Sequence, residues 1–254
     1  MVKPKKHLGQ HFLTDMSMSE KIVEAMDYSL ADSVIEIGPG TGVLTQFLAK
    51  KELDLILCEV DVESIAYLQN HYPQLHQRIL NQDFLKLDLK NRFSGTVNII
   101  GNFPYNISSQ ILFKAYENIE IVPQVVGMFQ KEVAQRVASG PGNKTYGILS
   151  VLLQAFYDIE YLFTIGPSAF YPPPKVDSGV IRLTRNKVES LACDKTMFTR
   201  VVKAAFGMRR KTLRNALKPI MNGGSMEKLP FLTKRAEQLS VDEFIELTCA
   251  IEQS

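Results

Sequence analysis

The chain has 254 residues, of which 45% are hydrophobic and 22% are charged, and these values are typical of a soluble globular protein. Its length predicts one large domain with at most a small second domain. No apolar run reaches the ~18 residues of a membrane span, and the basic start lacks the apolar stretch of a signal peptide. We therefore expect a cytoplasmic monomer with no membrane partner. The cysteines, Cys58, Cys193 and Cys249, lie far apart without CxxC spacing, which predicts neither disulfides nor a metal site.

The net charge of +2 is the sum of strongly segregated charges. Residues 200–218 contain seven basic residues and no acidic one, whereas residues 226–254 contain six acidic and three basic residues. A local excess of positive charge predicts a face that binds a polyanion. A solvated basic helix face would have the same pattern, so the charges alone leave both interpretations open.

Short apolar runs alternate with helical patterns from residue 33 to about residue 185, which is typical of a sheet wrapped by helices. The first five runs do not alternate with polar residues, as expected for parallel strands with both faces buried. The last two follow a helical stretch at 146–156 and lie close enough to form a hairpin-like pair at the sheet edge. The seven expected strands span residues 33–37, 53–59, 77–81, 97–101, 124–129, 161–165 and 176–184.

Beyond Asn186 the periodicity is helical only, and this change predicts a domain boundary. Ser240 is the expected N-cap of the last helix, with Glu243 at the capping-box position. We predict an α/β domain over residues 1–186 and a small all-α domain over residues 187–254. The helices expected in the second domain span residues 195–206, 211–221, 234–239 and 241–252.

A glycine-rich loop, VIEIGPGTGVLT, joins the first expected strand to a helix. In a doubly wound sheet this turn receives a nucleotide, and Gly38, Gly40 and Gly42 would let the backbone approach the ligand. The spacing is GxGxG and not GxGxxG, so a dinucleotide fits the pattern less well. Glycines also close many strand-to-helix turns that bind nothing.

Acidic residues accompany the ends of the first three strands. Glu59 ends the second strand, 21 positions after Gly38, and is placed to accept hydrogen bonds from both ribose hydroxyls. Asp83 follows the third strand and is placed to accept from an adenine amine. Glu36 disfavours a phosphate but suits a cationic ligand such as S-adenosylmethionine. Alone, Glu59 or Asp83 would more often be a solvated strand end, but together these features predict an adenosine-containing cofactor.

The segment GNFPYNIS follows the fourth strand. An exocyclic aromatic amine is a poor nucleophile, because its lone pair is delocalised, so an enzyme that methylates it must accept its hydrogens. The Asn102 side-chain oxygen and the Phe103 carbonyl can each accept one N–H. Pro104 restricts the loop, and Tyr105 offers a flat face for a base. Phe170 is expected to cover the opposite face of that base, with core packing as the alternative.

The order and spacing of these motifs resemble one known family. The matching stretches are KKHLGQHFL, EIGPGTGVLT, GNFPYNIS, QKEVAQRV, TYGILSVLLQ, SAFYPPPKVDS and AAFGMRRKTLRNAL. Over essentially its whole length the sequence resembles the KsgA (RsmA) ribosomal RNA small-subunit adenine dimethyltransferases. The resemblance implies a Rossmann-like class I S-adenosylmethionine-dependent methyltransferase fold. It also implies dimethylation of the N6 amines of two adjacent adenosines in the 3′-terminal hairpin loop of 16S (small-subunit) rRNA, in the immature 30S particle.

The resemblance carries functional residues onto this chain. One departure is His11, because many family members read GQNFL where this chain reads GQHFL. The family also uses its carboxyl-terminal helices for subunit recognition, which suits phosphate contacts from Arg209, Arg210, Lys211 and Arg214. The implied cofactor contacts are His11, Leu13, Gly38, Glu59, Asp83 and Asn102.

Two other functions remain open from the sequence. The related large-subunit rRNA adenine dimethyltransferases of the macrolide-resistance type share the catalytic motif. A non-catalytic ribosome-assembly factor would use the same fold only to bind rRNA. The segments FGMRRKTLRN and TYGILSV favour the small-subunit enzyme over the first, and the intact site residues argue against the second. Direct transfer from the sulfonium requires no metal.

Overall fold

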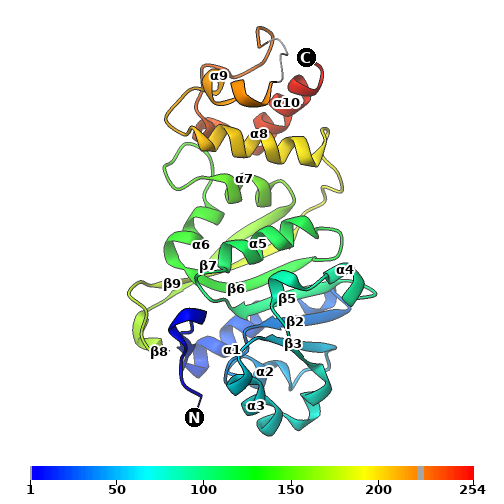
Figure 1. The fold of residues 1–254 in the computed structure, drawn as a ribbon, viewed down its shortest axis with the longest axis vertical. Coiled ribbons are helices and arrows are strands. Elements are labelled where there is room, and N and C mark those ends of the chain that lie inside the picture. The colour runs from blue at the N-terminus through cyan, green and yellow to red at the C-terminus, as the bar shows by residue number, and fades with distance from the viewer. Residues whose placement is uncertain (1, 222–225) are drawn as a thin grey trace. The chain divides into compact units, whose positions relative to one another are not determined.

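The computed structural model describes residues 2–221 and 226–254. Within them a seven-stranded sheet has the order β4-β3-β2-β5-β6-β9-β7 (Figure 1). The strands from β4 to β6 are parallel to their neighbours, and β9 is antiparallel to β6. Their bounds are β2 Ser33–Ile37, β3 Leu55–Glu59, β4 Ile79–Asn81, β5 Val97–Asn102, β6 Gln124–Gln130, β7 Tyr157–Ile165 and β9 Ser178–Arg185.

All seven strands lie where the apolar runs predict them, and the edge position of β7 beside β9 confirms the expected edge pair. In β3 all five residues are buried, because helices cover both faces of the sheet (Figure 1). These helices are α1 Met16–Glu24, α2 Thr45–Leu48, α3 Val62–His71, α4 Leu89–Arg92, α5 Ser108–Glu117 and α6 Lys131–Ala138.

The strand order reverses at β2: β3 and β4 lie on one side of it, and β5 and β6 lie on the other. The loops that follow β3 and β5 therefore leave in opposite directions, and a crevice opens at the carboxyl ends of the strands. Gly38 follows β2 at this crevice, Glu59 ends β3 and Asn102 ends β5. The topology therefore brings together the three motifs that the sequence analysis singled out.

A second sheet was not expected. Strands β1 Phe12–Leu13 and β8 Phe170–Tyr171 pair in an antiparallel fashion, with Phe12 opposite Tyr171 and Leu13 opposite Phe170. Leu13 and Phe170 are both buried, whereas Tyr171 is exposed. This pairing ties the amino-terminal arm, residues 5–13, to the loop that precedes β9.

The chain divides into two compact units, residues 1–134 with 159–185 and residues 135–158 with 186–254. The second unit therefore includes α7 Ile148–Gln154 together with the residues from 186 onward. Aromatic packing joins its two segments, because the Tyr146 ring meets the Phe206 ring at 6.0 Å and Phe206 stacks on Phe244 at 5.9 Å. The segment before β7 thus shares a core with the carboxyl-terminal helices.

Two of the four helices expected in the second unit form as predicted, as α8 Lys195–Gly207 and α10 Val241–Glu252. The capping box of α10 is confirmed, since the Ser240 hydroxyl accepts from the Glu243 N–H at 3.1 Å. The helix expected over residues 211–221 was wrong in extent. Pro219 lacks an N–H and disrupts the preceding turn, so α9 Leu213–Ala216 is followed only by a 3₁₀ segment. Residues 236–238 are likewise 3₁₀.

No helix in the described ranges is long and apolar enough to cross a lipid bilayer.

Candidate active site

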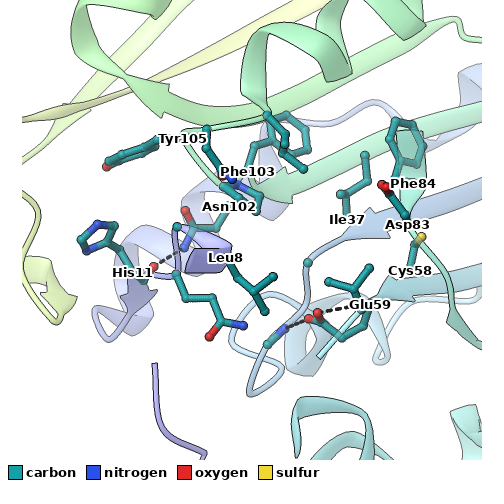
Figure 2. Close-up of a pocket in the computed structure, with 18 of the residues that line it drawn as sticks. Leu8, His11, Ile37, Cys58, Glu59, Asp83, Phe84, Asn102, Phe103 and Tyr105 are labelled. Atoms are coloured by element: carbon teal, nitrogen blue, oxygen red, sulfur yellow. Dashed lines mark hydrogen bonds between the residues drawn. The ribbon is translucent and has the colours of Figure 1, made fainter. Parts of the chain in front are cut away.

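A cavity of ≈ 310 Å³ lies at the carboxyl ends of β2, β3 and β5 (Figure 2). Its walls come from the amino-terminal arm, the glycine loop and the segments that follow β3, β4 and β5. The predicted site residues among them are His11, Gly38, Gly40, Glu59, Asp83, Asn102, Phe103, Pro104 and Tyr105.

The glycine loop needs glycine for two reasons. Gly38, Gly40 and Gly42 have φ values of 65°, 56° and 80°, in the left-handed region. Space is also restricted, because a Cβ at Gly40 would lie 2.8 Å from the Phe12 ring. Gly42 does not line the cavity, and a Cβ there would meet the Tyr72 ring at 2.6 Å. The loop thus lines the cavity at Gly38 and Gly40, with Gly42 packed behind it.

Glu59 is held firmly at the end of β3. Its side chain is buried, and its carboxylate accepts hydrogen bonds from the N–H groups of Gly40 at 3.0 Å, Val60 at 2.8 Å and Asp61 at 2.9 Å. Burial raises the pKa of Glu59, and these N–H groups offset part of the rise. A carboxylate can accept about four hydrogen bonds, so one position stays available for a ligand hydroxyl.

Asp83 and its neighbours line another part of the cavity wall. One Asp83 oxygen accepts from the Leu85 N–H at 2.9 Å. Cys58 and Phe84 also line this part, and sequence reasoning did not place them there. Burial raises the pKa of Cys58 to about 12, and its thiol donates to the Gln82 carbonyl at 3.2 Å. Cys58 is therefore a protonated thiol that contributes to the wall.

Glu36 does not face the cavity, contrary to the expectation that it would lie beside a cationic ligand. It is buried under the glycine loop, where its carboxyl accepts from the Thr45 hydroxyl at 2.7 Å. Burial raises the pKa of Glu36 to about 8. At neutral pH the group is therefore largely uncharged, and its contact is with the start of α2.

Asn102 is oriented by the amino-terminal arm. Its Nδ2 donates to the His11 carbonyl at 2.8 Å, so its Oδ1 is left as an acceptor (Figure 2). The carbonyl of Pro104, the residue after Phe103, already accepts a hydrogen bond from the Ile107 N–H at 3.1 Å. Of the Phe103 and Pro104 carbonyls, that of Phe103 is therefore the one left for an incoming amine.

The Phe103 side chain anchors this loop in the core. It is 1% exposed and meets the Phe129 ring edge to face at 5.1 Å. Gly101 and Gly127 make room for it, because a Cβ at Gly101 would lie 2.8 Å from the ring and one at Gly127 would overlap it. Two strand glycines, Gly101 at the start of the GNFPYNIS motif and Gly127 outside any motif, thus position the carbonyl of Phe103.

Tyr105 is fixed from two sides. Its hydroxyl shares a 2.6 Å hydrogen bond with the Ser178 hydroxyl at the start of β9, and its ring stacks on the His11 ring at 5.5 Å. Burial raises the pKa of Tyr105, so the phenol stays protonated at neutral pH. Nothing in the KVDSGV segment distinguishes Ser178 as a partner, and sequence reasoning missed it.

Two further predicted site residues, besides Gly42 and Glu36, are not in the cavity wall. Leu13 is 2% and Phe170 is 4% exposed, and both belong to the hydrophobic core beneath the site. The pairing of β1 with β8 turns both side chains inward, so Phe170 does not cover a base in this structure. The His11 side chain lies on the acceptor side, beside Tyr105, and its carbonyl rather than its ring serves Asn102.

The amino-terminal arm is fastened over the cavity by a buried carboxylate that the sequence did not reveal. Asp61 has a fully buried side chain that forms an ion pair with Lys5. It also accepts a 3.4 Å hydrogen bond from the Gln10 amide. Lys5 reaches Glu63 at 3.2 Å as well. Leu8, Gly9 and Gln10 are thereby held in the cavity wall.

Comparison with known proteins identifies the family. The model of the ribosomal RNA adenine dimethylase family matches residues 1–253. The chain belongs to this family. It is 57% identical over 249 residues to ribosomal RNA small subunit methyltransferase A of Cytophaga hutchinsonii, covering 97% of this chain and 96% of the relative. It is 53% identical over 256 residues to the protein of the same name from Bacteroides thetaiotaomicron, covering 100% and 96%.

Solved structures confirm the class I methyltransferase fold of this dimethylase. A dimethyladenosine transferase from Plasmodium falciparum superposes with a TM-score of 0.78 at 24% identity, covering 96% of this chain and 98% of the other. The 23S rRNA methyltransferase ErmE superposes with a TM-score of 0.71 at 22% identity, covering 95% and 100%. At these identities the likeness concerns the fold alone.

The basic stretch of the dimethylase contains residues in two different environments. Arg209 donates to the Asn143 carbonyl at 3.2 Å, lies 3.8 Å from the Glu237 carboxylate and covers the Phe206 ring. Arg209 therefore contributes to the packing of the second unit through these contacts. The other three predicted phosphate contacts, Arg210, Lys211 and Arg214, are exposed.

In the described part of the chain, no cluster of three or more His, Cys, Asp or Glu side chains is arranged to hold a metal ion.

Glu36 predicts a specific dependence of stability on pH. Because its pKa is raised to about 8 in the folded protein, the folded state binds more protons than the unfolded state between about pH 4.5 and pH 8. The free energy of unfolding therefore falls as the pH rises through this range. We expect Glu36→Gln, which keeps an acceptor for Thr45, to reduce this fall by several kcal/mol in denaturant titrations.

The exposed variant Glu52→Gln is the control, and it should keep the slope of the original protein. An unchanged slope in Glu36→Gln would show that Glu36 is charged in the folded protein.

Proposed function

We propose that this dimethylase uses S-adenosylmethionine to dimethylate the N6 amines of two adjacent adenosines in the 3′-terminal hairpin loop of small-subunit rRNA. The observation that carries the proposal is the orientation of Asn102, whose Nδ2 is bound by the His11 carbonyl so that Oδ1 accepts. This acceptor lies beside the stacked ring of Tyr105, at the edge of a cavity with a buried ribose acceptor.

The cavity residues fit the proposed cofactor. The backbone at Gly38 and Gly40 lines the cavity and allows close approach, Glu59 keeps one acceptor position for a ribose hydroxyl, and Asp83 is placed for the adenine amine. When bound, S-adenosylmethionine supplies an electrophilic methyl group. The remaining chemistry belongs to the protein, which binds the target amine and aims its lone pair.

The acceptor loop activates the amine by hydrogen bonding. Asn102 Oδ1 and the Phe103 carbonyl each accept one N–H, which draws the lone pair out of the ring and directs it at the methyl group. The proton leaves to solvent after transfer, since the methylated nitrogen is acidic. The second transfer is more demanding, because only one N–H remains and only one acceptor can engage it.

The small ribosomal subunit is the proposed substrate because both curated relatives described above carry that subunit in their names. The likeness to ErmE does not favour the large subunit, because at 22% identity it concerns the fold alone. The immature 30S particle, with the hairpin accessible, is the proposed partner of a monomeric, cytoplasmic enzyme. Arg210, Lys211 and Arg214 supply phosphate contacts that depend on salt and not on sequence.

The substrate assignment is tested with labelled S-adenosylmethionine and unmethylated small and large subunits in separate reactions. We expect label in the small subunit alone, as N6,N6-dimethyladenosine at two adjacent positions. Label mapped to the large subunit would favour the macrolide-resistance type of enzyme. Absence of any label, with intact binding to small subunits, would leave an assembly factor.

Asn102→Ala should abolish the dimethylated product, because it removes the side-chain acceptor of the amine. Loss of one preorganised donor or acceptor in an active site costs about 10²–10³ in rate. Mass spectrometry of the modified nucleosides measures the product, and calorimetry with S-adenosylmethionine checks the fold. Asn70→Ala, at an exposed position of α3, is the control. Dimethyladenosine at the original level in Asn102→Ala would refute the mechanism.

We expect the exposed residues of the basic stretch to act in RNA binding and Arg209 to act in packing. Lys211→Ala and Arg210→Ala should each weaken binding to small subunits and lower the salt slope of log K by about one. Arg209→Ala should instead lower the thermal stability of the protein, because it breaks the contacts to Asn143 and Glu237. Lys187→Ala, also exposed in the second unit, is the control for charge. Equal salt slopes in all four variants would contradict a phosphate role for the stretch.

A further inference from the structure

Lys114, a partly buried residue of α5, lies behind the part of the cavity wall that follows β4. Its Nζ donates to the Leu85 carbonyl at 2.9 Å, and the same ammonium lies over the Phe84 ring, 5.3 Å from its centre. Leu85 in turn donates its N–H to Asp83 at 2.9 Å. Figure 2 shows Asp83 and Phe84 together on one side of the pocket. One side chain of α5 therefore contacts the two residues that follow Asp83.

The segment that Lys114 contacts has few hydrogen bonds of its own, because Phe84–Lys86 is a single 3₁₀ turn. Before the turn, the chain is held against β3 by two hydrogen bonds to Gln82. The Glu59 carbonyl accepts from the Gln82 N–H at 3.1 Å, and the Cys58 thiol donates to the Gln82 carbonyl at 3.2 Å. Lys114 supplies a corresponding contact within the turn, from α5.

The ammonium of Lys114 is kept in place against a cost of burial. Burial lowers the pKa of Lys114 from its ordinary value, because a charge is less stable away from water. Nearby carboxylates offset part of this effect, and they are those of Glu117, Asp83 and Asp88. An apolar side chain would pack against Phe84 without the cost of burying a charge. What the lysine adds is a charged hydrogen bond to the turn, which is stronger than one between neutral groups.

The turn that Lys114 holds is part of the cavity wall. Asp83 and Phe84 both line the cavity, and Phe84 is 3% exposed. Lys114 is not among the lining residues. A hydrogen bond to a ligand weakens steeply with distance and angle, so a displacement of about 1 Å at Asp83 would cost much of it. Lys114 can therefore control ligand binding without touching the ligand.

We propose that Lys114 is a positioning residue for the adenine of S-adenosylmethionine, acting through the turn that carries Phe84 and Leu85. The inference rests on the proposed function, in which Asp83 accepts from the adenine amine. The hydrogen bond to the Leu85 carbonyl fixes the path of the backbone after Asp83, and the contact with the Phe84 ring fixes the wall beside it. Lys114 takes no part in methyl transfer, so cofactor binding depends on it and turnover at saturation does not.

The proposal is tested by calorimetry with S-adenosylmethionine and by steady-state methylation of small subunits. Lys114→Met keeps a side chain of similar length without charge or donor. It should weaken the affinity for S-adenosylmethionine and raise its KM about tenfold, with kcat and the KM for the subunit unchanged. Lys114→Arg keeps a cationic donor, and it should return both values to within about threefold of the original. Lys86→Met is the matched control, since Lys86 is an exposed lysine of the same turn.

The adenine amine provides a readout that a general loss of packing would not change. Two ligands are compared by calorimetry: S-adenosylhomocysteine, and an analogue with purine in place of adenine, which lacks the amine. The original protein should prefer the ligand with the amine about tenfold, because Asp83 accepts from it. This ratio should fall toward one in Lys114→Met and return in Lys114→Arg. Lys86→Met should keep the ratio of the original protein.

Three results would overturn the proposal. Unchanged affinity for S-adenosylmethionine in Lys114→Met would show that the turn keeps its position without the lysine. An equal loss of affinity for both ligands, at the original ratio, would give Lys114 a structural role alone. If the original protein binds neither ligand, the cofactor assignment fails and this inference fails with it. If it binds both but transfers no methyl group, the proposed reaction fails, whereas the binding comparison still decides the role of Lys114.

Discussion

The hydrogen bond from Asn102 Nδ2 to the His11 carbonyl decides what the active site can do. A carboxamide presents either an oxygen or an amino group, and only the oxygen can accept the hydrogens of a target amine. The bond therefore converts an ambiguous side chain into a defined acceptor. It works only while the amino-terminal arm stays in place, and the ion pair of Lys5 with Asp61 and the pairing of β1 with β8 both serve this purpose. The amino-terminal arm thus determines the hydrogen-bonding role of Asn102, which lies about ninety positions later in the chain.

The cofactor half depends on a different balance, between burial and hydrogen bonding. Glu59 is removed from solvent, which raises its pKa, and three backbone N–H groups partly compensate. One of these groups belongs to Gly40, so the carboxylate also fixes the glycine loop. Glu36 lies deeper, and the hydroxyl and N–H of Thr45 offset only part of the effect of burial, which raises its pKa to about 8. The two carboxyl groups beside the same loop therefore differ in how far hydrogen bonds compensate for burial.

The sequence predicted best where one physical constraint dominated. Strands with both faces buried require uninterrupted apolar runs, and all seven lie where these runs occur; the capping box at Ser240 is equally local. Predictions failed where long-range pairing outweighed the local pattern. Phe170 and Leu13 carry no sign that two-residue strands turn them into the core. Ser178 and Asp61 became functional partners only through tertiary contacts with Tyr105 and Lys5. The limit is therefore set by contacts between residues far apart in sequence.

Asp61 links the two halves of the site through one continuous set of contacts. Its N–H donates to Glu59, its carboxylate holds Lys5 and Gln10, and the residue after Gln10 orients Asn102. In the proposed function, a cofactor bound at Glu59 and a base bound at Asn102 would therefore both depend on this arm. Ordering the arm for one ligand would lower the entropic cost of ordering it for the other, which is a physical basis for positive coupling between them. Such coupling would suit the proposed reaction, in which S-adenosylmethionine binds repeatedly while one region of RNA is modified four times.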